Sequence, residues 1–122
     1  MELNGARLVK TELSFDDKRC RALLLELPNA CVLFLSEGEL ALGTLAIGMP
    51  ITGPQVGERI PSSACVLGQR YSTLARALAE RLALMSGKVA LVSLRAEGPE
   101  AEVAARAMAL LKEVMEGGER EP

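Results

Sequence analysis

The chain has 122 residues, of which 49% are hydrophobic, 2% aromatic and 25% charged, and its formal net charge is −2 at pH 7. This apolar content excludes an intrinsically disordered chain, and the length predicts a single domain over residues 1–122. The slightly acidic balance and the scarcity of aromatic rings argue against nucleic-acid binding. No apolar run is long enough to span a membrane, and the first ten residues hold no signal-peptide core, so we expect a cytoplasmic protein.

The sequence contains no histidine. This excludes Ser-His-Asp triads, Cys-His dyads and histidine metal sites. The cysteines Cys20, Cys31 and Cys65 lack metal-ligand spacing, and we interpret them as buried structural thiols. The glycines fit neither a P-loop nor a dinucleotide-binding motif. We therefore expect no enzymatic activity, no catalytic residue, no cofactor and no bound metal.

Four strands are predicted in the first half of the chain, because apolar residues there alternate with polar ones or form short continuous runs between turn signals. The predicted strands are Arg7–Phe15, Arg19–Leu27, Ala30–Leu35 and Leu40–Met49. Gly38, between the third and fourth strands, is free to take a positive φ in a turn. An antiparallel meander is the economical arrangement of four such strands.

The segment Pro50–Pro61 has three prolines, two glycines and no periodicity, which predicts a loop of the length at which loops often carry function. Apolar side chains in such a loop either fold back on their own domain or meet a partner. The candidate partner-binding residues are Ile51, Val56, Arg59 and Ile60.

The stretch Ser62–Leu94 predicts strand, helix, strand. The strand Ala64–Leu67 is short and apolar, and Leu74, Leu78 and Leu82 place one apolar stripe along the following helix. Gly87 sits where a left-handed C-cap would end that helix. Lys88–Leu94 forms the next strand, and the sequence leaves open whether the two strands are neighbours.

A second helix is predicted from Pro99 to the pair Gly117-Gly118, with a frayed tail at residues 119–122. Met108 and Met115 stand at helical spacing on this helix, and we interpret them as core residues. The predicted fold class is α+β, a mainly antiparallel six-stranded sheet with two helices packed on it. Two helices cannot cover all of this apolar sheet, which predicts a partner surface, most simply a second copy of the chain.

Four segments, LALGTLAIGMP, SSACVLG, LARALAERLALMSGKVALVSL and LLKEVM, resemble the small proteasome assembly chaperones of the third and fourth eukaryotic type. The resemblance covers about residues 23–116 and is closer to the fourth type. The residues that carry it are Leu42, Leu45, Ala46, Met49, Leu67, Gly68, Leu78, Ala79, Arg81, Leu82, Ala83, Val89, Val92 and Ser93.

The resemblance implies a non-enzymatic chaperone that acts as a dimer and binds α-type subunits of the 20S proteasome during ring assembly, without a cofactor. We expect a homodimer, and a prokaryotic, archaeal homologue of the eukaryotic proteins. Contact with a nucleic acid or a membrane is not expected.

A second interpretation is a roadblock- or longin-like homodimer that scaffolds or regulates small GTPases. Proteins of that group usually begin with a helix, whereas this chain begins with the predicted strand Arg7–Phe15. A cysteine- or tyrosine-based enzyme without histidine is a third and weaker interpretation.

Overall fold

The structure, a computed structural model, describes residues 2–50, 62–117 and 119–120. The strands are β1 (Glu2–Leu3), β2 (Ala6–Phe15), β3 (Lys18–Glu26), β4 (Ala30–Glu37), β5 (Thr44–Met49), β6 (Ser62–Leu67), β7 (Val89–Arg95) and β8 (Glu119–Arg120). The helices are α1 (Ser72–Ser86) and α2 (Glu100–Glu116). The α+β class is confirmed, with six main strands, two helices and the expected order along the chain.

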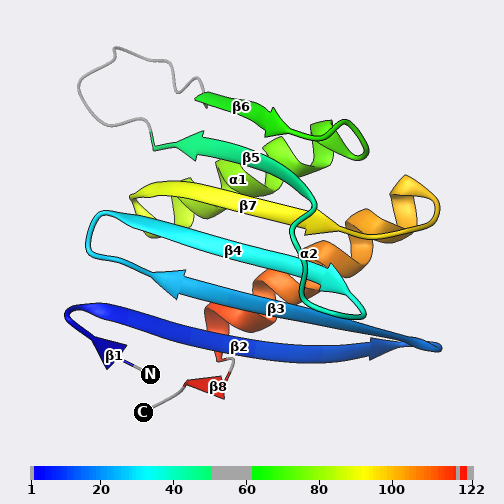
Figure 1. The fold of residues 1–122 in the computed structure, drawn as a ribbon, viewed down its shortest axis with the longest axis horizontal. Helices are drawn as coiled ribbons and strands as arrows, with labels where there is room; N and C mark the ends of the chain where they lie inside the picture. Colours follow the sequence, from blue (N-terminus) through cyan, green and yellow to red (C-terminus); the bar gives the residue numbers. More distant parts are fainter. Residues whose placement is uncertain (1, 51–61, 118, 121–122) are drawn as a thin grey trace.

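All the strands belong to one sheet, in the order β1-β2-β3-β4-β7-β5-β6, with β8 also paired to β2. Every pairing is antiparallel except that of β4 with β7. Both helices lie on the same face, behind the sheet in Figure 1. The strand β8 lies within residues 119–122, the segment predicted as a C-terminal tail. Its residues Glu119 and Arg120 pair with Lys10 and Val9 of β2.

The arrangement differs from a simple meander at one place. After β4 the chain does not turn back beside it, because β7 occupies that position and β5 pairs on the far side of β7. Residues 38–43 therefore cross the sheet in front of β7 (Figure 1), and the predicted fourth strand begins at Thr44 instead of Leu40. The strands β6 and β7, whose adjacency the sequence left open, are parallel but separated by β5.

The hydrophobic core lies between the sheet and the helix layer. α1 packs over β5, β6 and β7, while α2 packs over β2 and β3. The helices contribute Leu78, Leu82 and Leu111, each with at most 1% of its surface exposed. The expected C-cap at Gly87 is confirmed by its φ of 71°, and Gly38 takes the expected positive φ of 78°.

Candidate interaction surfaces

The face of the sheet that the helices do not cover, which we call the open face, carries large apolar side chains. On each strand the residues between the core positions point to this face, because successive side chains of a strand alternate. They have intermediate exposure in the isolated chain: Leu23, Leu25, Val32, Phe34, Leu45, Ile47, Val89 and Leu91. The open face is therefore an apolar surface of the kind that marks a protein-interaction site.

The strand register joins these side chains into rows. Leu25 is paired with Val32, Val32 with Leu91, and Leu91 with Ile47, so one uninterrupted apolar row crosses β3, β4, β7 and β5. No charged residue interrupts this row. On β2 and β3, Arg21 Nε forms an ion pair with Glu12 Oε2 at 2.8 Å.

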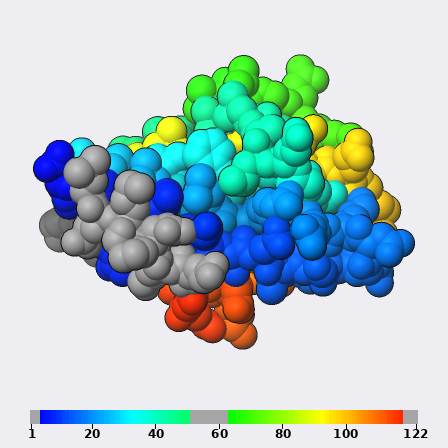
Figure 2. All heavy atoms as spheres, turned by 60° about the horizontal axis from the view of Figure 1, so that its bottom comes forward, coloured from blue at the N-terminus to red at the C-terminus, as the bar shows by residue number. Residues whose placement is uncertain are grey.

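The connection between β4 and β5 extends the apolar surface. The Gly43 N–H donates a hydrogen bond to Ser93 Oγ on β7 at 2.9 Å, which holds the crossing segment on the sheet. Gly43 is required there, since a Cβ atom would lie 2.2 Å from the Leu94 carbonyl oxygen. Leu42 on this segment is 57% exposed. Figure 2 shows atoms of this connection in front, beside those of the blue strands, with α2 only at the lower rim.

The two edges of the sheet are built differently. On the outer side of β2 the short strands β1 and β8 pair with it. No strand pairs with the outer side of β6 among the residues that the structure describes. β6 carries no charge, and its Val66 is 61% exposed. An uncharged, unpaired edge of this kind favours contact with another chain.

A charged cluster ties α2 to the end of β4. Glu37 Oε2 accepts hydrogen bonds from Arg106 Nη2 at 2.8 Å and Nε at 3.1 Å, and Lys18 Nζ lies 3.4 Å from Glu37 Oε1. The Arg106 and Glu37 side chains are only 11% and 14% exposed. Burial alone would raise the pKa of Glu37, but the hydrogen bonds from Arg106 and the Glu97 amide, with the charges of Arg106 and Lys18, lower it below its usual value. This geometry is typical of a structural ion pair that fixes a helix to a sheet.

The cysteines offer no activated thiol in this arrangement. Cys20 and Cys31 are buried as predicted. Burial, with the Glu37 charge, raises the pKa of the Cys20 thiol above its usual value, which is the wrong direction for a nucleophile. Cys65 is half-exposed instead of buried, because it lies on the edge strand β6, at the margin of the helix layer.

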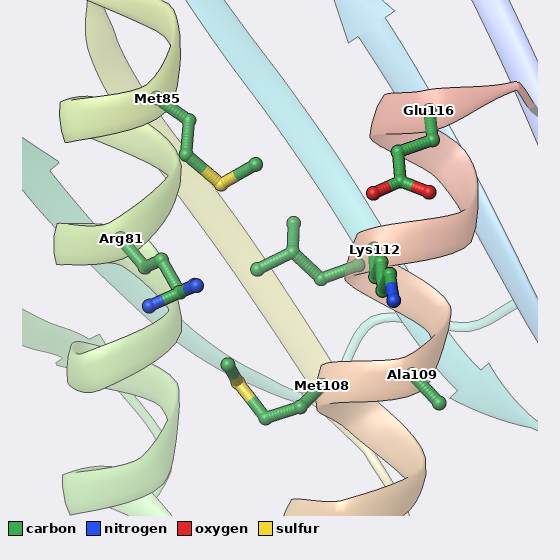
Figure 3. A pocket seen from close by; sticks show the side chains of 7 residues that line it. Arg81, Met85, Met108, Ala109, Lys112 and Glu116 are labelled. Carbon is green, nitrogen blue, oxygen red and sulfur yellow. The ribbon is translucent and has the colours of Figure 1, made fainter.

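A groove lies between the two helices on the opposite side of the molecule (Figure 3). Its lining residues are Arg81, Met85, Met108, Ala109, Leu111, Lys112 and Glu116. The prediction that Met108 is a core residue is wrong, because its side chain lines this groove and is 37% exposed. Met115, the other methionine so interpreted, is partly buried against the core. A helical-wheel analysis of α1 and α2 together would have found the groove only if their side-by-side position were known.

The four loop residues Ile51, Val56, Arg59 and Ile60, predicted as partner-binding, lie outside the described residues. Within the described ranges, no group of three or more His, Cys, Asp or Glu side chains is placed to hold a metal ion. In the same part of the chain, no helix is long and apolar enough to cross a membrane.

Comparison with known proteins supports one fold. No protein-family model and no curated protein sequence matches this chain. A chain in the crystal structure of a novel chaperone complex for yeast 20S proteasome assembly matches it with a TM-score of 0.63. The match covers 91% of this chain and 93% of that chain, with 10% sequence identity. This chain therefore has the fold of a proteasome assembly chaperone.

Proposed function

We propose that this protein is a non-enzymatic assembly chaperone that binds an α-type subunit of the 20S proteasome during ring assembly and acts as a homodimer in the cytoplasm. The observation that carries the proposal is the fold match with a yeast 20S proteasome assembly chaperone chain over 91% of this chain. Within that family we place it nearest the fourth eukaryotic type, as an archaeal homologue, on the sequence segments quoted above.

The open face supports the homodimer. Two copies related by a two-fold axis can pack their open faces together, as in sheet-on-sheet packing, and remove the rows of large apolar side chains from water. The row through Leu25, Val32, Leu91 and Ile47 lies in the middle of this face. Because it carries no charge, it can face its own copy without burying an unpaired ion.

The chemistry of the described residues supports binding instead of catalysis. The largely buried charged groups Glu37 and Arg106 are paired with each other and link two elements of the fold. The Cys20 thiol has a raised pKa, and Cys31 is fully enclosed in the core. An assembly chaperone needs surfaces of the right shape and charge, and it needs no reactive group.

The proposal is tested by mixing the purified protein with a purified α-type subunit from the same source and analysing the mixture by size-exclusion chromatography with light scattering. We expect a complex that contains two copies of the chaperone. Absence of a complex with any α-type subunit of the source would contradict the chaperone function.

The dimer interface is tested separately with Leu91→Lys, which places a charge in the central apolar row. We expect a folded monomer by sedimentation equilibrium, because burying an unpaired ammonium group in the interface costs several kcal/mol, on the order of the whole interface energy. A wild-type protein that is a stable monomer at micromolar concentration would overturn the homodimer.

A further inference from the structure

The groove between α1 and α2 is an apolar channel with charged rims. Its volume is about 460 Å³. Met85 on α1 and Met108 on α2 point into it from opposite sides (Figure 3). The buried Leu111 also lines it. Methionine side chains are flexible and polarisable, and they adapt to apolar side chains of varied shape. The interior of the groove is therefore suited to receive apolar side chains from another chain.

The rims of the groove carry charges that the fold itself does not use. Arg81 stands on α1, and Lys112 and Glu116 stand on α2. None of these three has an ion-pair or hydrogen-bond partner among the described residues, although Arg106 and Arg21 do. A cation on each helix, unpaired in this way, is available to carboxylates that approach along the groove.

The two helices run in the same direction. β6 and β7 are parallel, since each is antiparallel to β5, and α1 and α2 follow them and return across the same face. Their C-terminal ends thus lie together at one end of the groove, where Met85 and Glu116 are found (Figure 3). Two helix C-termini and a carboxylate make that end electrically negative.

We propose that this groove binds a single α-helix of the α-type subunit, so the inference rests on the proposed function. The apolar stripe of the bound helix enters between Met85 and Met108, and carboxylates beside that stripe pair with Arg81 and Lys112. The bound helix runs antiparallel to α1 and α2, which places its positive N-terminal end beside Glu116 and the two C-termini. A helix seated in an apolar groove is an established mode of recognition.

A second copy of this chain does not fit the groove through a two-fold axis, because such an axis would set one hollow surface against the same hollow surface. The complementary shape is convex, and a helix with side chains on one stripe supplies it. The unpaired cations on both rims select an acidic helix over a basic one.

The test uses two helical peptides of equal length and the same leucine stripe, one flanked by glutamates and the other by lysines. Binding to the full-length protein is measured by fluorescence anisotropy. We expect the glutamate peptide to bind at least about tenfold more tightly, and the double variant Arg81→Glu, Lys112→Glu to reverse this preference. Both substituted side chains are exposed, so the fold is expected to persist, and circular dichroism checks it.

The control is Arg76→Glu, which makes the same charge change as one of the two substitutions, on an exposed residue of the same helix that does not line the groove. It should leave the peptide preference unchanged. Equal binding of the two peptides to the wild type, an unreversed preference in the double variant, or an equal effect of the control would each overturn the proposal.

The same variants, titrated with the purified α-type subunit, separate this inference from the proposed function. If the wild type binds the subunit and the double variant binds it equally well, the groove proposal fails while the chaperone function stands. If the wild type binds no α-type subunit, the proposed function fails, and a reversed peptide preference would still establish the groove as an acidic-helix site. If the double variant binds the subunit about tenfold or more weakly and the control variant does not, the result supports both the groove proposal and the chaperone function.

Discussion

Beneath α1, the strand β5 and the start of β7 carry residues of different size on their two faces. On β5 and β7 the side beneath α1 carries Ala46, Gly48 and Ala90, while the open side carries Ile47 and Leu91. Small residues let the helix backbone approach closely, and a Cβ atom on Gly48 would lie 2.4 Å from the Ala79 carbonyl oxygen. The large side chains on the open face are covered by neither helix of the part of the chain that the structure describes. At this place, residue size distinguishes the contact with α1 from the contact that we propose to form between two copies.

The largest expected effect compares two leucines on neighbouring central strands. Leu33 on β4 is fully buried beneath the helices, and Leu91 on β7 lies half-exposed on the open face. We expect Leu33→Ala to lower the free energy of unfolding by about 2–5 kcal/mol, because it leaves a cavity in the core. Leu91→Ala should lower it by less than half as much and weaken the dimer instead. Urea denaturation of dilute protein and sedimentation velocity measure the two effects, and equal losses of stability would contradict the difference between the faces.

The close approach of α1 to the sheet is tested at Gly48. The substitution Gly48→Ala should lower the free energy of unfolding by about 1–3 kcal/mol, because the new methyl group forces the helix and β5 apart. The matched control is Gly117→Ala, where no atom lies within 4 Å of the new Cβ atom and φ is extended at −178°. Thermal unfolding of both variants gives the comparison. If both lose the same stability, α1 is not seated as closely as described.

The attachment of α2 depends on pH through Glu37. Because its pKa is lowered in the folded state, its ionisation stabilises the fold fully above the unfolded pKa of about 4.5, and this contribution is lost as the pH falls through the lower folded value. We expect Glu37→Gln to cost about 1–3 kcal/mol at neutral pH and almost nothing at strongly acidic pH. Glu12→Gln, which breaks the exposed pair with Arg21, should cost about 1 kcal/mol or less at any pH. Denaturant titrations across pH measure both, and a pH-independent cost for Glu37→Gln would contradict the assignment.

The smallest expected effect concerns the predicted loop Pro50–Pro61 and tests whether it contributes to binding of the partner. We expect replacement of Ile51, Val56 and Ile60 by Ser to weaken binding of the α-type subunit about tenfold, since burial of one such side chain contributes about 1.5–3 kcal/mol. The fold is checked by circular dichroism, and the affinity is measured by titration. Unchanged affinity would exclude the loop and direct attention to the groove between the helices.

The sequence predicts the strands and helices of this fold better than it predicts which strands pair. Strands and helices follow from local periodicity. The turn at Gly38 and the helix end at Gly87 are also predictable, because both depend only on the local backbone conformation. Pairing is different. Nothing in residues 40–43 indicates that β7 lies between β4 and β5, so their apolar character predicts part of a strand.

Of the two candidate surfaces, the sequence predicts the open face but not the groove between the helices. The excess of apolar strand residues predicted an uncovered face, and that face is present. The groove between the helices was missed, because Met108 and Met85 are separated in sequence and each alone has the spacing of a core residue. Their common position depends on how two helices sit on the sheet, which local patterns do not encode.

The central position of β7 also determines how this chain can acquire its structure. β2, β3 and β4 form one set of antiparallel strands, and β5 and β6 form another. Among the described residues the two sets are joined only by β7, which follows both in the sequence. During synthesis the two halves of the sheet therefore remain unconnected until residues 89–95 have left the ribosome. Long-range pairing of this kind slows folding and exposes strand edges in the meantime. Because β7 is the last of the six main strands, the middle of the sheet closes late in synthesis.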